Sequence, residues 1–167
     1  YNTKLTEMNY FQGVEGHSTA QFDDKQNMQR LSRFLWSDNL KVNQLNSIDQ
    51  KGKNLNFHIS YSCENGTHYR KVINNKYSKN WLIVDKLSSF KKFALLRWKL
   101  FKADWKLKGN SLESKLVKID ISCEHSNYKL FLDKSYDSLF YNKKESIFEL
   151  KVYLFSWGEI KTLIQLF

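Results

Sequence analysis

Proline is absent from this chain of 167 residues, against a usual share of about 5%. No proline-rich linker therefore divides the chain, and no internal repeat or low-complexity tract is visible. A chain of this length buries roughly 70% of its unfolded surface on folding, which needs no disulfide or metal for support. We expect residues 1–167 to form a single domain.

Cysteine is also scarce. Cys63 and Cys123 are the only two, and neither belongs to a Cys-x-x-Cys pair, which excludes a zinc ribbon or a thioredoxin-like motif. Each lies in alternating apolar sequence, where a free thiol behaves as a small core residue. A single disulfide between them is the alternative, so the redox compartment stays open.

Long hydrophobic runs are missing as well. No window approaches the ~18 consecutive apolar residues of a membrane span, so no membrane span is expected. No signal peptide is visible, and the chain begins at Tyr1 instead of methionine. We therefore expect the natural protein to extend upstream, although a shortened chain would begin in the same way.

Positive charge is in excess, with 27 Lys and Arg against 17 Asp and Glu and a formal net charge of +10. This excess favours polyanionic partners such as nucleic acid, acidic lipid or acidic polysaccharide. The lysines form no long block, so an ordinary solvated surface is the plainer alternative. A nucleic-acid partner is not expected, because no helix-turn-helix, zinc-finger or aromatic RNA-binding motif occurs.

The hydrophobic pattern has the two-residue period of strands. Residues 55–63 alternate between apolar and polar side chains, and Asn65-Gly66 then suggests a two-residue hairpin turn before a return strand at 67–73. Further strands are predicted at 18–23, 31–36, 81–84, 93–101, 115–123, 128–132, 146–155 and 160–167. Residues 1–16 have turn composition. Strands at this spacing predict an all-β, antiparallel β-sandwich.

Several segments resemble, in order, the C-terminal domain of heparinase II/III-like proteins. They are residues 10–19 (YFQGVEGHST), 22–26 (FDDKQ), 33–36 (RFLW), 67–72 (THYRKV), 81–87 (WLIVDKL), Trp98 and 138–141 (SLFY). The resemblance covers the whole chain. Two departures stand out: Gln12 replaces a frequent arginine, and Ser18 replaces the usual asparagine after His17.

The resemblance implies a β-sandwich of the super-sandwich type, with an α/α toroid domain upstream that is absent from this chain. It also implies that the parent protein is a polysaccharide lyase, which cleaves uronic-acid-containing acidic polysaccharide by β-elimination in the periplasm or outside the cell. The catalytic Tyr, Asn and His groups would belong to the toroid. No catalytic residue is therefore assigned to this chain, and we expect it to be inactive alone.

Five residues are predicted site residues. His17 is expected to bind a divalent metal, zinc or calcium, together with upstream ligands, so that this chain alone binds none; the alternative is a histidine that caps a loop. His68 and Arg70 share a strand face and could bind a sulfate or carboxylate, or could form a buried polar network instead. Arg30 and Arg33 are candidate residues of a cleft rim. His58 and His125 are assigned no function.

Tryptophans could stack on sugar rings, although core packing is the commoner role of a tryptophan in a strand. Trp81 in particular is expected in the core. A noncatalytic carbohydrate-binding or structural β-sandwich is the alternative function, because the departures at Gln12 and Ser18 fit a domain that has kept only the fold.

Overall fold

The computed structural model describes residues 4–32, 35–37, 40–45, 54–75, 77–124, 127–140 and 143–167. They form two antiparallel sheets, which confirms the predicted sandwich. The four-stranded sheet contains, in spatial order, β1 (Ala20–Phe22), β6 (Ala94–Lys99), β11 (Lys143–Leu154) and β10 (Tyr128–Phe140). The eight-stranded sheet contains β2 (Lys41–Leu45), β3 (Asn54–Cys63), β4 (Gly66–Asn75), β5 (Asn80–Ser88), β12 (Gly158–Leu166), β9 (Val117–Cys123), β8 (Ser111–Glu113) and β7 (Lys106–Lys108).

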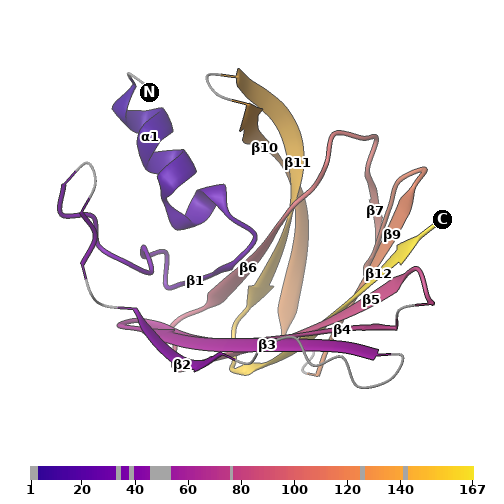
Figure 1. The fold of residues 1–167 in the computed structure, drawn as a ribbon, viewed down its shortest axis with the longest axis horizontal. Coiled ribbons are helices and arrows are strands. Elements are labelled where there is room, and N and C mark those ends of the chain that lie inside the picture. Colours follow the sequence, from indigo (N-terminus) through magenta and orange to yellow (C-terminus); the bar gives the residue numbers. More distant parts are fainter. Residues whose placement is uncertain are drawn as a thin grey trace.

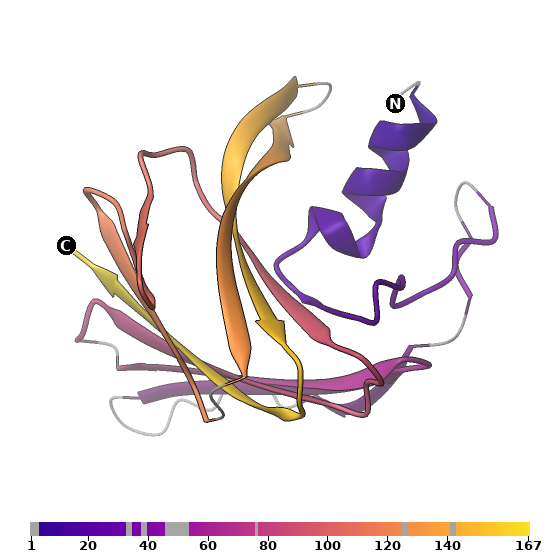
Figure 2. The ribbon, with the colours of Figure 1, turned by 180° about the vertical axis from the view of Figure 1, so that it is seen from behind.

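The eight-stranded sheet curves below the four-stranded sheet and up along one side of it (Figure 1). Helix α1 (Leu5–Gln12) lies on the opposite side of β10 and β11, so the four-stranded sheet has one face toward the core and one toward α1. The view from behind shows the same order, with α1 and the end of β12 on opposite sides of the molecule (Figure 2). A short 3-10 turn, η1 (Val14–Gly16), follows the helix.

One hydrophobic core fills the space between the sheets. Phe22, Leu96, Leu150 and Ile160 are among its fully buried members. Burial alternates along β9, as expected for a strand with one face toward the core, whereas β1 and the first four residues of β6 are buried on both faces. Residues 93–101, predicted as a strand, contain β6, which pairs with β1 on one side and with β11 on the other.

The N-terminal region differs from prediction. Residues 5–12 form a helix where turn composition suggested loops, and no side chain caps its first turn, so the usual start signal is missing. The segment predicted as a strand at 31–36 forms only an isolated bridge between Arg30 and Trp36 in its described part. The strands β2, β7 and β8 were not predicted, because they are only three to five residues long.

Two further predictions were wrong in detail. Trp81 is 38% exposed instead of buried, because it lies near the start of β5, where the inward face that carries Ile83 and Leu87 leaves the core. The strand predicted at 115–123 begins two residues later, as β9 at Val117, and Leu116 before it is exposed. Cys63 and Cys123 are free thiols packed against the core.

No helix in the described residues is long and apolar enough to cross a membrane.

The hairpin between β3 and β4 turns one residue earlier than predicted. Cys63 pairs with Gly66, so Glu64 and Asn65 form the loop and Gly66 begins β4. The reason for glycine is a close approach: a Cβ at Gly66 would lie 2.5 Å from ring atoms of the fully buried Phe22. Gly66 thus lets the hairpin of one sheet pack directly on β1 of the other.

Replacing Gly66 by alanine should lower the free energy of unfolding by about 1–3 kcal/mol, because an added methyl group overpacks the core. Urea denaturation followed by tryptophan fluorescence measures the change. The control is Gly109→Asn, at a positive φ of 58° with no neighbouring atom within 4 Å of its Cβ position. Asparagine tolerates that backbone, so equal losses in the two variants would refute the role of the Phe22 contact.

Asp23 holds the start of β6 in place. Its carboxylate accepts hydrogen bonds from the backbone N–H groups of Lys91, Lys92 and Phe93, at 2.9, 2.7 and 3.0 Å. Burial acts to raise the pKa of Asp23, but these three bonds outweigh it, and the pKa lies below its ordinary 3.8. The charged form is therefore the one that the fold stabilises.

Asp23→Asn should lower the free energy of unfolding by about 1–2 kcal/mol near neutral pH, where the charged hydrogen bonds are intact. A group whose pKa is depressed by folding contributes stability above its unfolded value and loses it on acidification. The difference between the two proteins should therefore shrink as the pH falls through and below 3.8. Asp24→Asn is the control, since Asp24 also has a positive φ, 62°. A difference that does not change with pH would contradict this account.

Candidate functional site

A buried carboxylate connects two of the motifs noted in the sequence. Asp85 of β5 is fully buried and accepts hydrogen bonds from Nε2 of His68 at 2.6 Å and from Nε of Arg70 at 2.7 Å. Nη2 of Arg70 donates to the second carboxylate oxygen at 3.3 Å. The register explains the meeting, because Arg70 lies directly opposite Asp85 and His68 lies one inward-facing position away on β4.

The histidine continues the network toward β3. Nδ1 of His68 lies 3.2 Å from the hydroxyl of Tyr61, which is 2.9 Å from Oγ1 of Thr19. Burial raises the pKa of Tyr61, so its hydroxyl stays protonated and can donate to His68. With Nε2–H donating to Asp85, one imidazole tautomer satisfies both contacts. Nδ2 of Asn27 also donates to the Tyr61 oxygen, at 3.3 Å.

Arg70 extends the same network to the four-stranded sheet. Its Nη1 donates to the carbonyl oxygen of Ser18 at 3.0 Å, and its guanidinium lies 4.5 Å from the ring centroid of Trp98 on β6. The backbone N–H of Lys99 donates to Oγ of Ser18 at 2.9 Å. The loop that follows His17 is thereby held between the two sheets.

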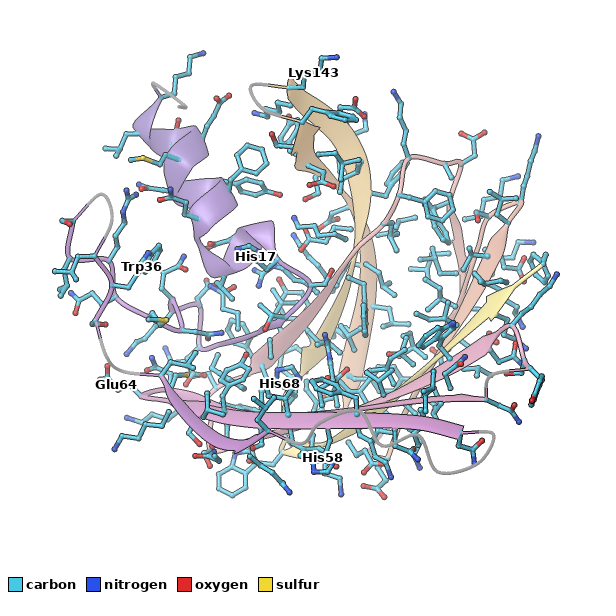
Figure 3. The ribbon with its side chains drawn as sticks, in the orientation of Figure 1. His17, Trp36, His58, Glu64, His68 and Lys143 are labelled. Atoms are coloured by element: carbon cyan, nitrogen blue, oxygen red, sulfur yellow. The ribbon has the colours of Figure 1, made fainter. Side chains whose placement is uncertain are left out.

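His17 is exposed at the end of η1 and beside the lower end of α1 (Figure 3). It lines a pocket of about 350 Å³, together with Trp36, Asn27 and Thr19. Gln26 also lines this pocket and is bonded to η1: it donates to both carboxylate oxygens of Glu15 and accepts from the N–H of Val14. The Asp85 network and this pocket share Thr19 and Asn27, so the buried network supports one wall of the pocket.

The predicted site residues do not form one cluster. His68 and Arg70 converge on Asp85, and His68 is only 3% exposed. This arrangement corresponds to the buried polar network that was the alternative to anion binding. Arg30 lies apart, where it donates to Asn9 of α1 and to the carbonyl of Ser32 and packs 5.9 Å from the Trp36 ring. Arg33 lies outside the described residues. Substrate binding by any of them stays a prediction.

His58 and His68 lie on opposite faces of the eight-stranded sheet (Figure 3). His58, which was assigned no function, faces away from the core. His125 lies outside the described residues. Among the residues that the structure describes, no group of three His, Cys, Asp or Glu side chains could hold a metal ion. One exposed imidazole does not make a zinc site, which needs about three protein ligands. The described residues therefore do not fit a metal centre by themselves.

Comparison with known proteins decides the family. The family model described as "Heparinase II/III-like, C-terminal" matches residues 1–147. This chain belongs to the heparinase II/III-like family. The match includes the segments that carry His17, His68, Arg70 and Asp85, and it confirms the resemblance noted in the sequence.

Solved structures share the fold of this heparinase II/III-like domain. A structure titled "Heparinase III-BT4657 gene product" matches with a TM-score of 0.77 at 14% sequence identity. The match covers 100% of this chain and 26% of that one. The heparan sulfate lyase HepC from Pedobacter heparinus has a TM-score of 0.70 at 16% identity, with coverage of 100% and 27%. The chain thus spans about a quarter of the length of these proteins. No curated protein matches its sequence.

Sequence reasoning missed Asp85 as the centre of the network. The signal was present, because Asp85 is a charged residue on the same strand face as Ile83 and Leu87, and a charge on a buried face requires a partner. It also missed Tyr61, whose hydroxyl was read only as part of an apolar alternation.

Asp85→Asn should lower the free energy of unfolding by about 3–5 kcal/mol, because it leaves the Arg70 guanidinium without its buried counter-charge. Urea denaturation followed by circular dichroism measures the change. Asp120→Asn is the matched control: Asp120 is 34% exposed and pairs with Lys118, so its loss should cost under about 1 kcal/mol. Similar costs for both variants would argue against a buried hub.

Proposed function

We propose that this domain forms one wall of the substrate cleft of a polysaccharide lyase, which cleaves uronic-acid-containing acidic polysaccharide by β-elimination. The family match over residues 1–147 is the observation that carries the proposal. The similar fold of a heparan sulfate lyase and the net charge of +10 support it, since a cationic protein attracts a polyanionic chain.

β-Elimination needs a base that removes the proton at C5 of the uronate, a group that stabilises the developing charge on its carboxylate, and a proton for the departing C4 oxygen. No described residue is assigned to these steps. We propose that a toroid domain joined to this one supplies them, and that this domain positions the polysaccharide. The domain's own task is then to keep the pocket beside His17 in a fixed shape.

The Asp85 network is suited to that task. It holds Ser18 and Thr19 through Arg70 and Tyr61. Trp36 lines the pocket, and Arg30 packs on the Trp36 ring and bonds to Asn9 of α1. We propose that Arg30 meets acidic groups of the sugar chain beside this pocket. The same role is proposed for Arg33, which lies outside the described residues. His68 and Arg70 would reach substrate only by giving up contacts with Asp85, so a direct role for them requires the network to open.

A metal at His17 is proposed only together with ligands from outside the described residues. A zinc or calcium ion bound there would stabilise negative charge on a substrate carboxylate. Within this chain, the residue provides a single exposed imidazole on a loop that the Asp85 network fixes.

Noncatalytic carbohydrate binding is a second candidate, and one observation favours it. Phe93, Phe131 and Phe155 surround Tyr153 on the outward face of the four-stranded sheet, with ring centroids 5.7, 5.7 and 6.4 Å from its own. Lys129 lies 5.7 Å from the Phe155 ring. Aromatic rings beside lysines are suited to stacking on sugars that carry acidic groups.

The test is to incubate heparan sulfate, alginate and a bacterial capsular polysaccharide with two proteins, residues 1–167 and the natural protein that carries them. Ultraviolet absorbance detects the unsaturated uronate product. We expect product from the natural protein on at least one glycan and none from residues 1–167 alone. In the natural protein, Arg30→Gln should raise KM several-fold with little change in kcat, and Lys108→Gln, on β7, should change neither.

Two results would overturn this proposal. Turnover by residues 1–167 would place the catalytic groups in this domain. Failure of the natural protein on every acidic glycan, with glycan binding retained, would leave the carbohydrate-binding function instead.

A further inference from the structure

A second pocket of about 350 Å³ lies on the outward face of the four-stranded sheet, beneath α1. Tyr10 and Phe11 of α1 contribute to one wall, and Arg97, Ser135 and Glu149 contribute from three strands. It is separate from the pocket beside His17, and the two have no lining residue in common. A volume of this size is enough for one small ligand.

Arg97 supplies an unsatisfied donor in this pocket. The residue is 6% exposed; its Nε lies 3.0 Å from Oε1 of Glu149, and its Nη2 donates to Oε1 of Gln21 at 2.5 Å. Its Nη1 is buried and has no hydrogen-bond partner within the described part of the chain, and Oε1 of Glu149 meets Arg97 as an ion pair without a hydrogen bond. A buried guanidinium nitrogen without an acceptor destabilises the fold. A ligand that accepts a hydrogen bond from it would remove that cost.

The charges around Arg97 do not balance. Nζ of Lys99, whose side chain is 11% exposed, lies 3.0 Å from Oε2 of Glu149. Glu149 is therefore the one buried carboxylate for two largely buried cations in this cluster. The remaining neighbours are the neutral hydroxyl groups of Tyr10 and Ser135, which bond to Lys99 and to each other. A second negative charge would neutralise the cluster.

The rim of the pocket adds more positive charge. Lys134, Lys144 and Lys151 line it. Lys144 pairs with Glu7 at 3.4 Å, and Lys151 pairs with Asp133 at 2.9 Å. The remaining rim carboxylate, that of Glu15, accepts hydrogen bonds from Gln26 through both of its oxygens.

We propose that this pocket binds an oxyanion, a carboxylate or a sulfate, through Arg97 with help from the rim lysines. An arginine forms short, charge-assisted hydrogen bonds with such groups. The anion would accept from Nη1 after a small shift of the α1 wall and would supply the missing negative charge. The inference goes beyond the proposed function, since the site can exist whether or not the parent protein is a lyase.

Isothermal titration of the protein with sodium sulfate, sodium glucuronate and glucose, at constant ionic strength, tests the site. Sulfate and glucuronate should bind saturably and glucose should not. Arg97→Lys should weaken binding about tenfold or more, because it keeps the charge but removes the planar donors. Lys144→Gln, at an exposed rim position, should weaken it several-fold, and it guards against a folding defect in the Arg97 variant.

Glu15→Gln should strengthen anion binding several-fold, because it removes a negative charge from the rim while keeping the side-chain size. Lys41→Gln, the same charge change as Lys144→Gln but on the exposed strand β2, should leave binding unchanged. Tighter binding of glucuronate than of sulfate would show that the sugar ring contributes, and equal binding would show that the anion alone is recognised. Both results support the site.

No saturable binding of either anion would overturn the proposal, and so would binding that Lys41→Gln and Lys144→Gln weaken equally. Weaker binding after Glu15→Gln would also contradict the proposal, because it would mean that the negative charge of Glu15 helps to hold the site in its binding form. None of these results depends on lyase activity, so the two proposals can fail separately.

Discussion

A single buried carboxylate connects the two sheets of this domain. Asp85 has no exposed surface, and the low polarity of its surroundings makes its charge tolerable only while Arg70 and His68 remain bonded to it. Arg70 in turn reaches the backbone of Ser18 and the ring of Trp98. The position of the loop beside His17 therefore depends on a charge pair in the eight-stranded sheet.

Strand β6 carries two different polar clusters on its two faces. Trp98 faces the interior and contacts Arg70, whereas Arg97 and Lys99 face outward and meet Glu149 under α1. The alternation of a strand places them there, since neighbouring side chains point to opposite faces. A change in β6 should thus be felt both beside His17 and in the pocket beneath α1.

The sandwich could be predicted from the sequence because its strands repeat an inside-outside pattern over six or more residues, as in β3 and β9. The pairing of His68 and Arg70 on one face followed from their spacing. What failed was governed by tertiary contacts: α1 lacks a capping residue, Gly66 is required by the Phe22 ring from a distant strand, and the exposure of Trp81 depends on where the opposing sheet ends. Likewise, Arg97 and Glu149 alternate with apolar residues as solvated charges do, yet both are buried on the face of the sheet that α1 covers.

Amide hydrogen exchange in an Arg70→Gln variant tests most directly whether the charge pair holds the loop. The backbone N–H of Lys99 donates to Ser18, and that of Arg97 donates to the carbonyl of Thr19. If Arg70 fixes this loop, both amides should exchange much faster in the variant, while amides in the centre of the β10–β11 ladder change little. Unchanged protection at Arg97 and Lys99, or a uniform loss over the whole domain, would contradict the account.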